Sequence, residues 1–323
     1  MNSLKFGVID FHCDALGKLQ QHPDICFEED ERLDVSLHKL KQGSVGLQCF
    51  AVFITDDPEQ ARIGRVLEQL SLFRSRVEKA GIALVASRQE LAALNAAGGI
   101  GGMLSLEGAH GLEGNLNYLQ SCYDLGVRFL GITWNHANWA ADGVMELRGG
   151  GFTERGKELI RRCHELGIVL DVSHLSVKGF WELTEAAEQA GRPFIASHSN
   201  SMAVCSHPRN LSDEQIRTIV RLGGRIGLTF VPPFVKPSGP VKMTDLLPHL
   251  EHLCSLGAEN HIMFGSDFDG IEEHILGLED ASKYAAWKEL LLKYYSGQLV
   301  DKWLSVNALR FLQTWLPAIK KAL

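Results

Sequence analysis

The chain has 323 residues, of which 45% are hydrophobic and 22% charged, and its formal net charge is -7. These values are typical of a globular protein that is long enough for one large domain or two modest ones. A mildly acidic chain without a basic block or basic helical face argues against nucleic acid as the main partner. No apolar run approaches the roughly 18 residues that a membrane-spanning helix requires, so we expect no membrane partner either.

The start of the chain and its cysteines indicate the compartment. Residues 1–6 lead directly into an apolar stretch and contain neither a signal core nor a cleavage site, so we expect a cytoplasmic protein. The seven cysteines form no C-x-x-C pair, which gives no sign of a disulfide framework or a cysteine zinc site. We expect them to be reduced and mostly buried.

In chain order, apolar runs and helical periodicity alternate. Strands are predicted at 6–11, 45–54, 103–107, 127–133, 168–174, 193–198, 225–231 and 261–267, with a further short strand at 82–86. A polar loop is expected at 20–34 and a turn or helix start at 55–58. A short amphipathic segment lies at 35–42. Helices are predicted at 59–80, 89–97, 116–125, 153–166, 179–190, 213–222, 246–256 and within the tail 278–323.

This alternation predicts the fold class. Eight strands with helices between them favour a (β/α)₈ barrel over a doubly wound open sheet. The first strand is not followed by G-x-G-x-x-G, which weakens the dinucleotide-binding alternative further. Because no repeat, low-complexity tract or linker interrupts the pattern, we expect one barrel domain over residues 1–323, with the C-terminal helices packed on the barrel.

Side chains that bind metals stand at the ends of these predicted strands. Along a strand, residues i and i+2 point to the same side, and the ends of all barrel strands meet at one rim, where active sites form. Three histidines with three carboxylates can hold one or two zinc-like ions, and a glutamate can bridge two of them. The six residues are His12, Asp14, Glu107, His174, His198 and Asp267.

Each of these residues also has a simpler explanation. A buried histidine at a strand end is often only hydrogen-bonded, and an aspartate there often caps the next helix. An isolated His-x-Asp would favour that explanation. Six such residues at the same rim of a barrel are improbable as coincidences, so the joint pattern favours a metal site.

The order of the motifs carries a resemblance to a known family. Residues 10–270 contain Asp-x-His-x-Asp, Ser-Leu-Glu-Gly, Asp-Val-Ser-His, Ser-His-Ser and Gly-Ser-Asp-Phe-Asp-Gly, in that order. This series resembles the renal (membrane) dipeptidases, the M19 metallopeptidases of the amidohydrolase superfamily. The resemblance implies a (β/α)₈ barrel with two zinc ions that hydrolyses dipeptides, including some with a C-terminal D-residue.

The resemblance also implies a ligand set. His12 and Asp14 would hold one zinc ion, His174 and His198 would hold the other, and Glu107 would bridge them. A hydroxide between the two metals would then attack the scissile carbonyl, with one zinc ion polarising that carbonyl.

Two further residues match the family's substrate-handling positions. Asp267 would orient the nucleophile and pass its proton to the leaving amine, while the nearby Asp269 is expected to be structural. Arg209, in Pro-Arg-Asn, matches the arginine that binds the terminal carboxylate of the substrate. A planar guanidinium pairs with a carboxylate through two parallel hydrogen bonds, and this requirement would explain a preference for dipeptides.

Two motifs depart from the family pattern. Mammalian members carry a histidine directly after a threonine in the loop that follows the fourth strand, whereas Thr133 is followed here by Trp134-Asn135-His136. Either Asn135 or His136 takes that role or no residue does, which leaves the donor to the reaction's oxyanion open. Near the C-terminus, Ser305-Val306-Asn307 stands where the family has a glycine before the asparagine.

Three functions therefore follow from the sequence. The first is a binuclear zinc dipeptidase with a small dipeptide substrate, which the resemblance suggests is a homodimer. The second is a related metal-dependent amidohydrolase that acts on N-acyl amino acids or β-lactams. The third is a barrel that binds a peptide or metal without catalysis, against which the complete ligand set argues.

Overall fold

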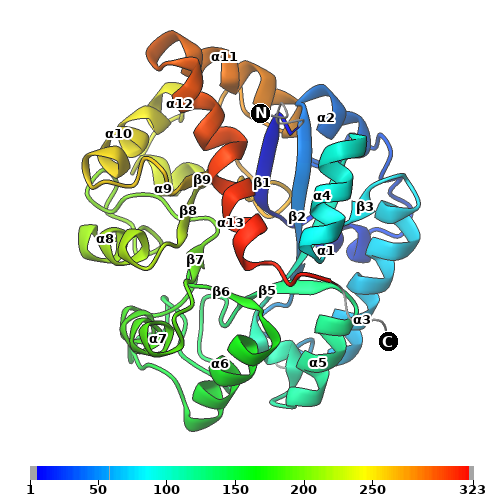
Figure 1. Cartoon of the computed structure of the whole chain (residues 1–323), viewed down its shortest axis with the longest axis vertical. Coiled ribbons are helices and arrows are strands. Elements are labelled where there is room, and N and C mark those ends of the chain that lie inside the picture. Colours follow the sequence, from blue (N-terminus) through cyan, green and yellow to red (C-terminus); the bar gives the residue numbers. More distant parts are fainter. Residues whose placement is uncertain (1–5, 58, 320–323) are drawn as a thin grey trace.

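The computed structural model describes residues 6–57 and 59–319 (Figure 1). The ends of the predicted domain, residues 1–5 and 320–323, and Pro58 of the predicted turn lie outside the described residues. One parallel sheet contains the strands β1 (Val8–Cys13), β2 (Val45–Phe53), β3 (Ala83–Leu84), β4 (Gly101–Glu107), β5 (Val127–Gly131), β6 (Val169–Asp171), β7 (Ile195–Ala196), β8 (Arg225–Leu228) and β9 (Ile262–Phe264).

The sheet closes on itself through eight of these strands. Its order is β2-β1-β9-β8-β7-β6-β5-β4, and β2 also pairs with β4, from Leu47 opposite Gly101 to Phe53 opposite Glu107. The short strand β3 pairs only with β4 and lies outside the closure. The predicted (β/α)₈ barrel is therefore confirmed, and all eight predicted barrel strands are present.

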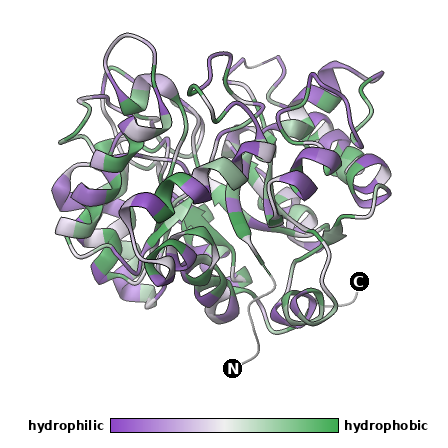
Figure 2. Cartoon of the chain, turned by 90° about the horizontal axis from the view of Figure 1, so that it is seen from above, coloured by the Kyte–Doolittle hydropathy of each residue, from purple (hydrophilic) through white to green (hydrophobic). Residues whose placement is uncertain are grey.

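The helices surround the barrel, as expected for parallel strands that are covered on their outer face (Figure 1). Their bounds are α1 (Ala15–Gln21), α2 (Leu37–Gln42), α3 (Ile63–Leu72), α4 (Arg88–Ala97), α5 (Leu116–Asp124), α6 (Glu154–Leu166), α7 (Val177–Ala190), α8 (Asp213–Arg221), α9 (Pro232–Val235), α10 (Leu247–Ser255), α11 (Tyr284–Tyr294), α12 (Gly297–Asp301) and α13 (Asn307–Trp315). Figure 2 shows hydrophobic residues gathered on the inner strands, while the helices carry both hydrophobic and hydrophilic faces.

Two predicted segments differ from the structure. The region expected to be an irregular polar loop from residue 20 is preceded by helix α1, which extends to Gln21. The helix predicted at 59–80 begins at Ile63 and changes at Phe73–Glu78 to a π-helical turn. Helix α1 is only seven residues long, too short to show a clear helical period in the sequence.

The C-terminal helices pack on the barrel, as predicted. Helix α13 covers the end of the barrel at which the strands begin, where Leu309, Phe311 and Leu312 join a buried cluster with side chains from inside the barrel. The buried Asn307 side chain donates to the backbone oxygen of Ile262 in β9. Asn307, in the partly kept Ser305-Val306-Asn307 motif, therefore fixes the base of a strand rather than the rim.

Strands β5 to β9 each end two or three residues earlier than predicted. At two places, buried carboxylates accept the backbone hydrogen bonds of the loops at the strand ends. Strand β6 ends at Asp171, whose Oδ1 accepts from the backbone N–H groups of Ser173 (3.1 Å) and Ser197 (2.9 Å). Near the ends of β1 and β9, Asp10 Oδ1 accepts from His12 N (3.2 Å) and Ser266 N (2.9 Å). The rim residues therefore lie in short loops that these aspartates hold in place.

Two other expectations concern the whole chain. All seven cysteines are free, and five of them are buried, in agreement with the sequence. No helix in the described part of the chain is long and apolar enough to cross a membrane.

Candidate metal centre and substrate cavity

The six predicted rim residues meet at the carboxyl ends of the barrel strands. Glu107 is the last residue of β4, and its two oxygens face different histidines. Its Oε2 lies 3.4 Å from His12 Nε2, while its Oε1 lies 3.0 Å from His174 Nε2 and 3.6 Å from His198 Nε2. All these side chains are buried or nearly so, with exposed fractions from 1% for His198 to 16% for Asp267.

Backbone pairing at the ends of the first and last strands brings the remaining two rim residues, Asp14 and Asp267, together. Asp14 N donates to Phe268 O (2.9 Å), and Asp267 N donates to His12 O (3.2 Å). His12 Nε2 consequently lies 3.4 Å from Asp14 Oδ2 and 3.7 Å from Asp267 Oδ1. Residues that follow the first and the last strand of the barrel, far apart in the sequence, thus lie side by side in one half of the site.

The geometry separates into two main groups of possible metal ligands that share Glu107. One group contains His12, Asp14 and Glu107, and the other contains Glu107, His174 and His198. Within each group, one potential ligand atom per residue lies within 4.8 Å of the others. A third overlapping group, His12, His198 and Asp267, places Asp267 beside both. This is the arrangement expected of two metal positions with a bridging carboxylate.

The donor atoms fit divalent metal ions. His12 Nε2 and Asp14 Oδ1 are buried and have no hydrogen-bond partner among the described residues, although a buried polar atom ordinarily has one. His174 Nε2 and His198 Nε2 lie only 2.9 Å apart. Nitrogen and carboxylate oxygen donors without sulfur suit zinc and similar ions, which would satisfy these unpaired atoms.

Burial and charge set the protonation of the ligands. Burial, reinforced by Arg209, lowers the pKa of His174 to about 4, and burial lowers the pKa of His198 well below its ordinary value. Both imidazoles are therefore neutral at pH 7, the form that binds metals. Burial opposes charging of His12, but Glu107 and Asp14 outweigh it and raise its pKa. Despite burial, the charge of His12 holds the pKa of the Glu107 carboxyl well below its usual range.

Asp267 differs from Glu107 in its protonation. Burial, together with repulsion from Asp14 and Glu107, raises the pKa of Asp267 to about 7. Its backbone adopts φ 69°, a left-handed conformation that is uncommon for residues other than glycine and is frequent at functional sites. A carboxyl group with such a pKa can both accept and donate a proton near neutral pH.

The other ring nitrogens of two ligands have partners of their own. His174 Nδ1 lies 3.1 Å from Asn135 Oδ1. His198 Nδ1 lies 2.6 Å from Ser197 Oγ, and that hydroxyl donates to Asp171 Oδ2. Asp171 was not among the predicted site residues, although the aspartate in Asp-Val-Ser-His, three residues before a candidate ligand, was the available signal.

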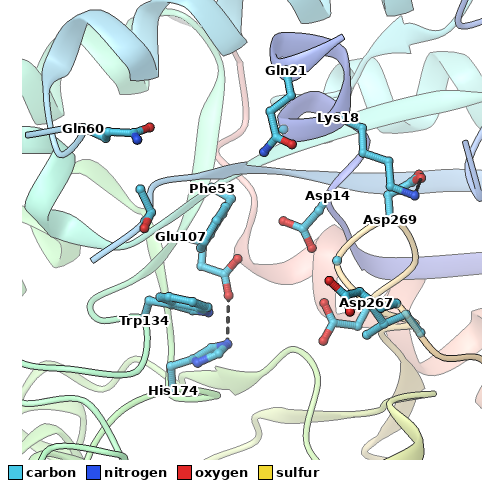
Figure 3. A pocket seen from close by; sticks show the side chains of 15 residues that line it. Asp14, Lys18, Gln21, Phe53, Gln60, Glu107, Trp134, His174, Asp267 and Asp269 are labelled. Carbon is cyan, nitrogen blue, oxygen red and sulfur yellow. Dashed lines mark ion pairs between the residues drawn. The ribbon is translucent and has the colours of Figure 1, made fainter. Parts of the chain in front are cut away.

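Four of the rim residues, Asp14, Glu107, His174 and Asp267, line a cavity of about 550 Å³ (Figure 3). Phe53 and Trp134 form an aromatic wall, with ring centroids 5.1 Å apart and planes at 72°. The wall also contains polar and charged side chains: Lys18, Gln21, Gln60, Asp269 and Glu272. None of these wall residues was predicted to contact substrate. Phe53 ends strand β2, Lys18 and Gln21 lie on helix α1, and the others lie in loops, where Asp269 was expected to be structural.

The predicted carboxylate-binding residue Arg209 lies beside the ligands, not on the cavity wall. It is 3% exposed, and its Nη2 is 2.9 Å from His174 Nε2. Its Nε and Nη1 are buried and have no hydrogen-bond partner among the described residues. Burial lowers its pKa to about 10, so the guanidinium remains charged at pH 7. The buried cation therefore has two donors available for an acceptor from outside the chain.

Residues 134–136, where the chain departs from the family pattern, lie in three different environments. Trp134 takes the position directly after Thr133 and lines the cavity. Asn135 faces His174. The His136 side chain is exposed and is not among the residues that line the cavity, and its backbone N–H donates to Asp56 Oδ2. No histidine of this segment lies at the cavity wall.

Asp269, expected to be structural, joins three segments. It accepts hydrogen bonds from the backbone N–H groups of Asp34 (2.8 Å) and Val35 (2.9 Å), and it lies 3.0 Å from Lys18 Nζ. Its neighbour Asp267 is therefore held in a loop that is fixed to helix α1 and to the segment before α2.

Comparison with known proteins identifies relatives along nearly the whole chain. The sequence model of the membrane dipeptidase family (peptidase family M19) matches residues 3–318. A protein of Schizosaccharomyces pombe named as an uncharacterized dipeptidase is 31% identical over 278 residues, which are 80% of this chain and 66% of that protein. For another curated relative, from Klebsiella pneumoniae, the match covers 64% of that protein. The chain therefore spans less than two thirds of the length of these two curated relatives.

Two solved structures share the fold closely. A metallopeptidase described as dipeptidase AC of family M19 superposes with a TM-score of 0.88 at 27% identity, covering 98% of this chain and 100% of that one. A metallopeptidase of Rhodobacter sphaeroides, solved with a phosphinate mimic of the dipeptide L-Ala-D-Ala, gives 0.87 at 26% identity, covering 97% and 99%. With its barrel, its clustered metal ligands and the family match over residues 3–318, this chain belongs to the membrane dipeptidase family, peptidase family M19.

Proposed function

We propose that this protein is a binuclear metallodipeptidase and that its two ions are zinc. The observation that carries the proposal is the position of Glu107, with one oxygen toward His12 and the other toward His174 and His198. A glutamate placed in this way can serve two metal positions at once. When bound, two such ions would polarise the substrate carbonyl and lower the pKa of the attacking water.

We assign the proton transfers to Asp267. Its Oδ1 lies 3.7 Å from His12 Nε2, next to both groups of ligands. An ionised Asp267 would orient the attacking water and accept its proton, and the protonated form would then donate to the leaving nitrogen. The raised pKa of this carboxyl suits both steps, because a proton carrier works best with a pKa close to the working pH.

Arg209 would bind the C-terminal carboxylate of the substrate. His174 Nε2 has a single lone pair, which cannot serve both a metal ion and the N–H of Arg209. Metal binding would therefore free Nη2, and a carboxylate could pair with this guanidinium through two hydrogen bonds. Because Arg209 lies beside the candidate ligand His174, a carboxylate bound to it would be close to the bond that is cleaved. Only a short peptide has its C-terminal carboxylate so close to that bond, so the arrangement supports dipeptides as substrates.

The relative from Rhodobacter sphaeroides, whose ligand mimics L-Ala-D-Ala, supports the acceptance of a C-terminal D-residue. The test is a panel of dipeptides with L and D residues at each position, run on protein with a measured zinc content. We expect turnover of dipeptides, loss of turnover on chelation and recovery on addition of zinc. Absence of turnover across the panel in protein that holds two zinc ions would refute a dipeptidase.

A second candidate is an amidohydrolase for N-acyl amino acids or β-lactams, because Arg209 would accept the carboxylate of those substrates equally well. The free amino group separates the candidates. A comparison of Ala-D-Ala, Ala-L-Ala and N-acetyl-Ala should show a strong preference for the two dipeptides. Equal or faster hydrolysis of N-acetyl-Ala would favour the second candidate.

Two properties of the whole protein belong to the same proposal. We place it in the cytoplasm as a homodimer, on the basis of the sequence and the family. Cell fractionation tests the location. Sedimentation at several protein concentrations tests the oligomeric state.

A further inference from the structure

We propose that Asn135 is a positioning residue that prepares one metal position selectively, the position of His174 and His198. This inference rests on the proposed metal-dependent function. It gives a role to the residue that follows Trp134 in the segment where the family's substrate-side histidine is missing. In this chain, that segment would act on a metal ligand and on the cavity wall, not on the oxyanion.

Asn135 determines the tautomer of His174. A neutral imidazole carries its proton on one nitrogen and a lone pair on the other. Asn135 Oδ1, 3.1 Å from Nδ1, can only accept a hydrogen bond, so it places the proton on Nδ1. Nε2 then presents its lone pair to the site, where Glu107 Oε1 lies 3.0 Å away. The contact of Arg209 Nη2, a donor, with the same Nε2 agrees with this tautomer.

The second histidine of this position is fixed in the same way by different groups. The Ser197 hydroxyl donates to Asp171 Oδ2 and can therefore accept from His198 Nδ1, 2.6 Å away. Asp171 is itself held by the backbone of the strand ends, since its Oδ1 accepts from Ser173 N and Ser197 N. Both imidazoles of this position thus present Nε2 lone pairs before any metal arrives.

The other position has a different composition. It contains one imidazole and one carboxylate besides Glu107, and its Asp14 lines the open cavity. Among the described residues, no hydrogen bond links Asn135 to His12 or Asp14. Removal of the Asn135 acceptor should therefore weaken one metal equivalent and leave the other nearly unchanged. Loss of such an outer partner commonly lowers metal affinity by about 10–100-fold.

The experiment measures zinc binding by competition with a chromogenic chelator in wild type and three variants. Asn135→Leu removes the acceptor while keeping the size of the side chain. Asn135→Asp keeps an acceptor oxygen. His136→Ala is the matched control, because this neighbouring side chain is exposed and only its backbone N–H makes the contact with Asp56. Thermal unfolding of each metal-free variant reports whether it folds.

We expect wild type to bind two zinc ions per chain. In Asn135→Leu one equivalent should bind about 10–100-fold more weakly, whereas Asn135→Asp and His136→Ala should bind both within a few-fold of wild type. Unchanged binding of both equivalents in Asn135→Leu, or an equal loss of both, would overturn the positioning role and leave the dipeptidase proposal standing. A wild-type protein that binds no zinc would instead overturn the proposed function together with this inference.

If Asn135→Leu does not fold, Asn135→Ser and the Asp171→Asn variant provide the second measurement. Serine is too short to reach Nδ1 from the same backbone position, and Asp171→Asn weakens the acceptor behind Ser197. Each should weaken the same single equivalent. Loss of different equivalents in the two variants would contradict a shared role at the His174 and His198 position.

Discussion

The floor and the wall of the cavity are built in different ways. The floor consists of the six rim residues His12, Asp14, Glu107, His174, His198 and Asp267. They lie at or just beyond strand ends, and buried aspartates fix the surrounding backbone. The wall residues, such as Lys18, Gln21 and Trp134, come from helix α1 and from loops. A rigid floor preserves the geometry that the chemistry needs, whereas a wall of loop side chains can change without disturbing it.

The largest expected effect is at the centre of the floor. Glu107→Gln removes the charge from the only side chain shared by both main ligand groups. We expect both zinc equivalents to weaken and kcat/KM to fall by at least about 1,000-fold, because activation of water and of the carbonyl contributes several kcal/mol. Zinc titration and dipeptide hydrolysis on the same samples provide the measurement. A variant that retains two tightly bound zinc ions and full activity would show that Glu107 does not bridge.

The next effect separates chemistry from metal binding within the floor. Asp267→Asn removes the proton carrier while leaving His12, Asp14 and Glu107 in place. We expect kcat to fall by about 100- to 10,000-fold, the usual contribution of a positioned acid or base. Zinc content should stay close to two per chain. Unchanged kcat at full zinc content would exclude the role assigned to Asp267.

A smaller effect is expected where the floor meets the substrate. Arg209→Lys keeps the charge but loses the planar pair of donors, so we expect kcat/KM for dipeptides to fall by about 10- to 100-fold. Dipeptide amides, which lack the terminal carboxylate, should be poor substrates for both proteins and should show little difference between them. Equal losses for the acid and the amide would mean that Arg209 supports the ligands and does not bind the carboxylate.

The smallest effect is expected on the wall. Trp134→Ala removes one face of the aromatic wall that Trp134 shares with Phe53. We expect KM to change by up to about 10-fold, most for substrates with large apolar side chains, because the loss is one of contact area. Zinc content should remain unchanged, and kcat should remain within a few-fold of wild type. A collapse of kcat would show that Trp134 takes part in the chemistry, and it would contradict the separate roles of the floor and the wall.

Sequence patterns were sufficient for the barrel and for all six floor residues. Each barrel strand is a short apolar run, and parallel strands of a closed barrel must bring their carboxyl ends to one rim. A histidine or carboxylate at such an end is therefore placed by its own strand alone. For this reason His12, Glu107 and His198 could be predicted to meet although long stretches of sequence separate them.

The wall and the outer partners of the ligands could not be predicted in this way. Asp269 is fixed by the backbone of Asp34, 235 residues away, and Asn135 faces a histidine of another loop. The early end of β6 depends on where the Asp171 carboxylate finds its donors. These positions result from hydrogen bonds between distant segments, which no local period or spacing records. The sequence by itself determined the barrel and the cluster of histidines and carboxylates at its rim, because strand ends are local features. Only the tertiary structure decided which side chains orient that cluster and line the cavity, because that depends on contacts between segments far apart in the chain.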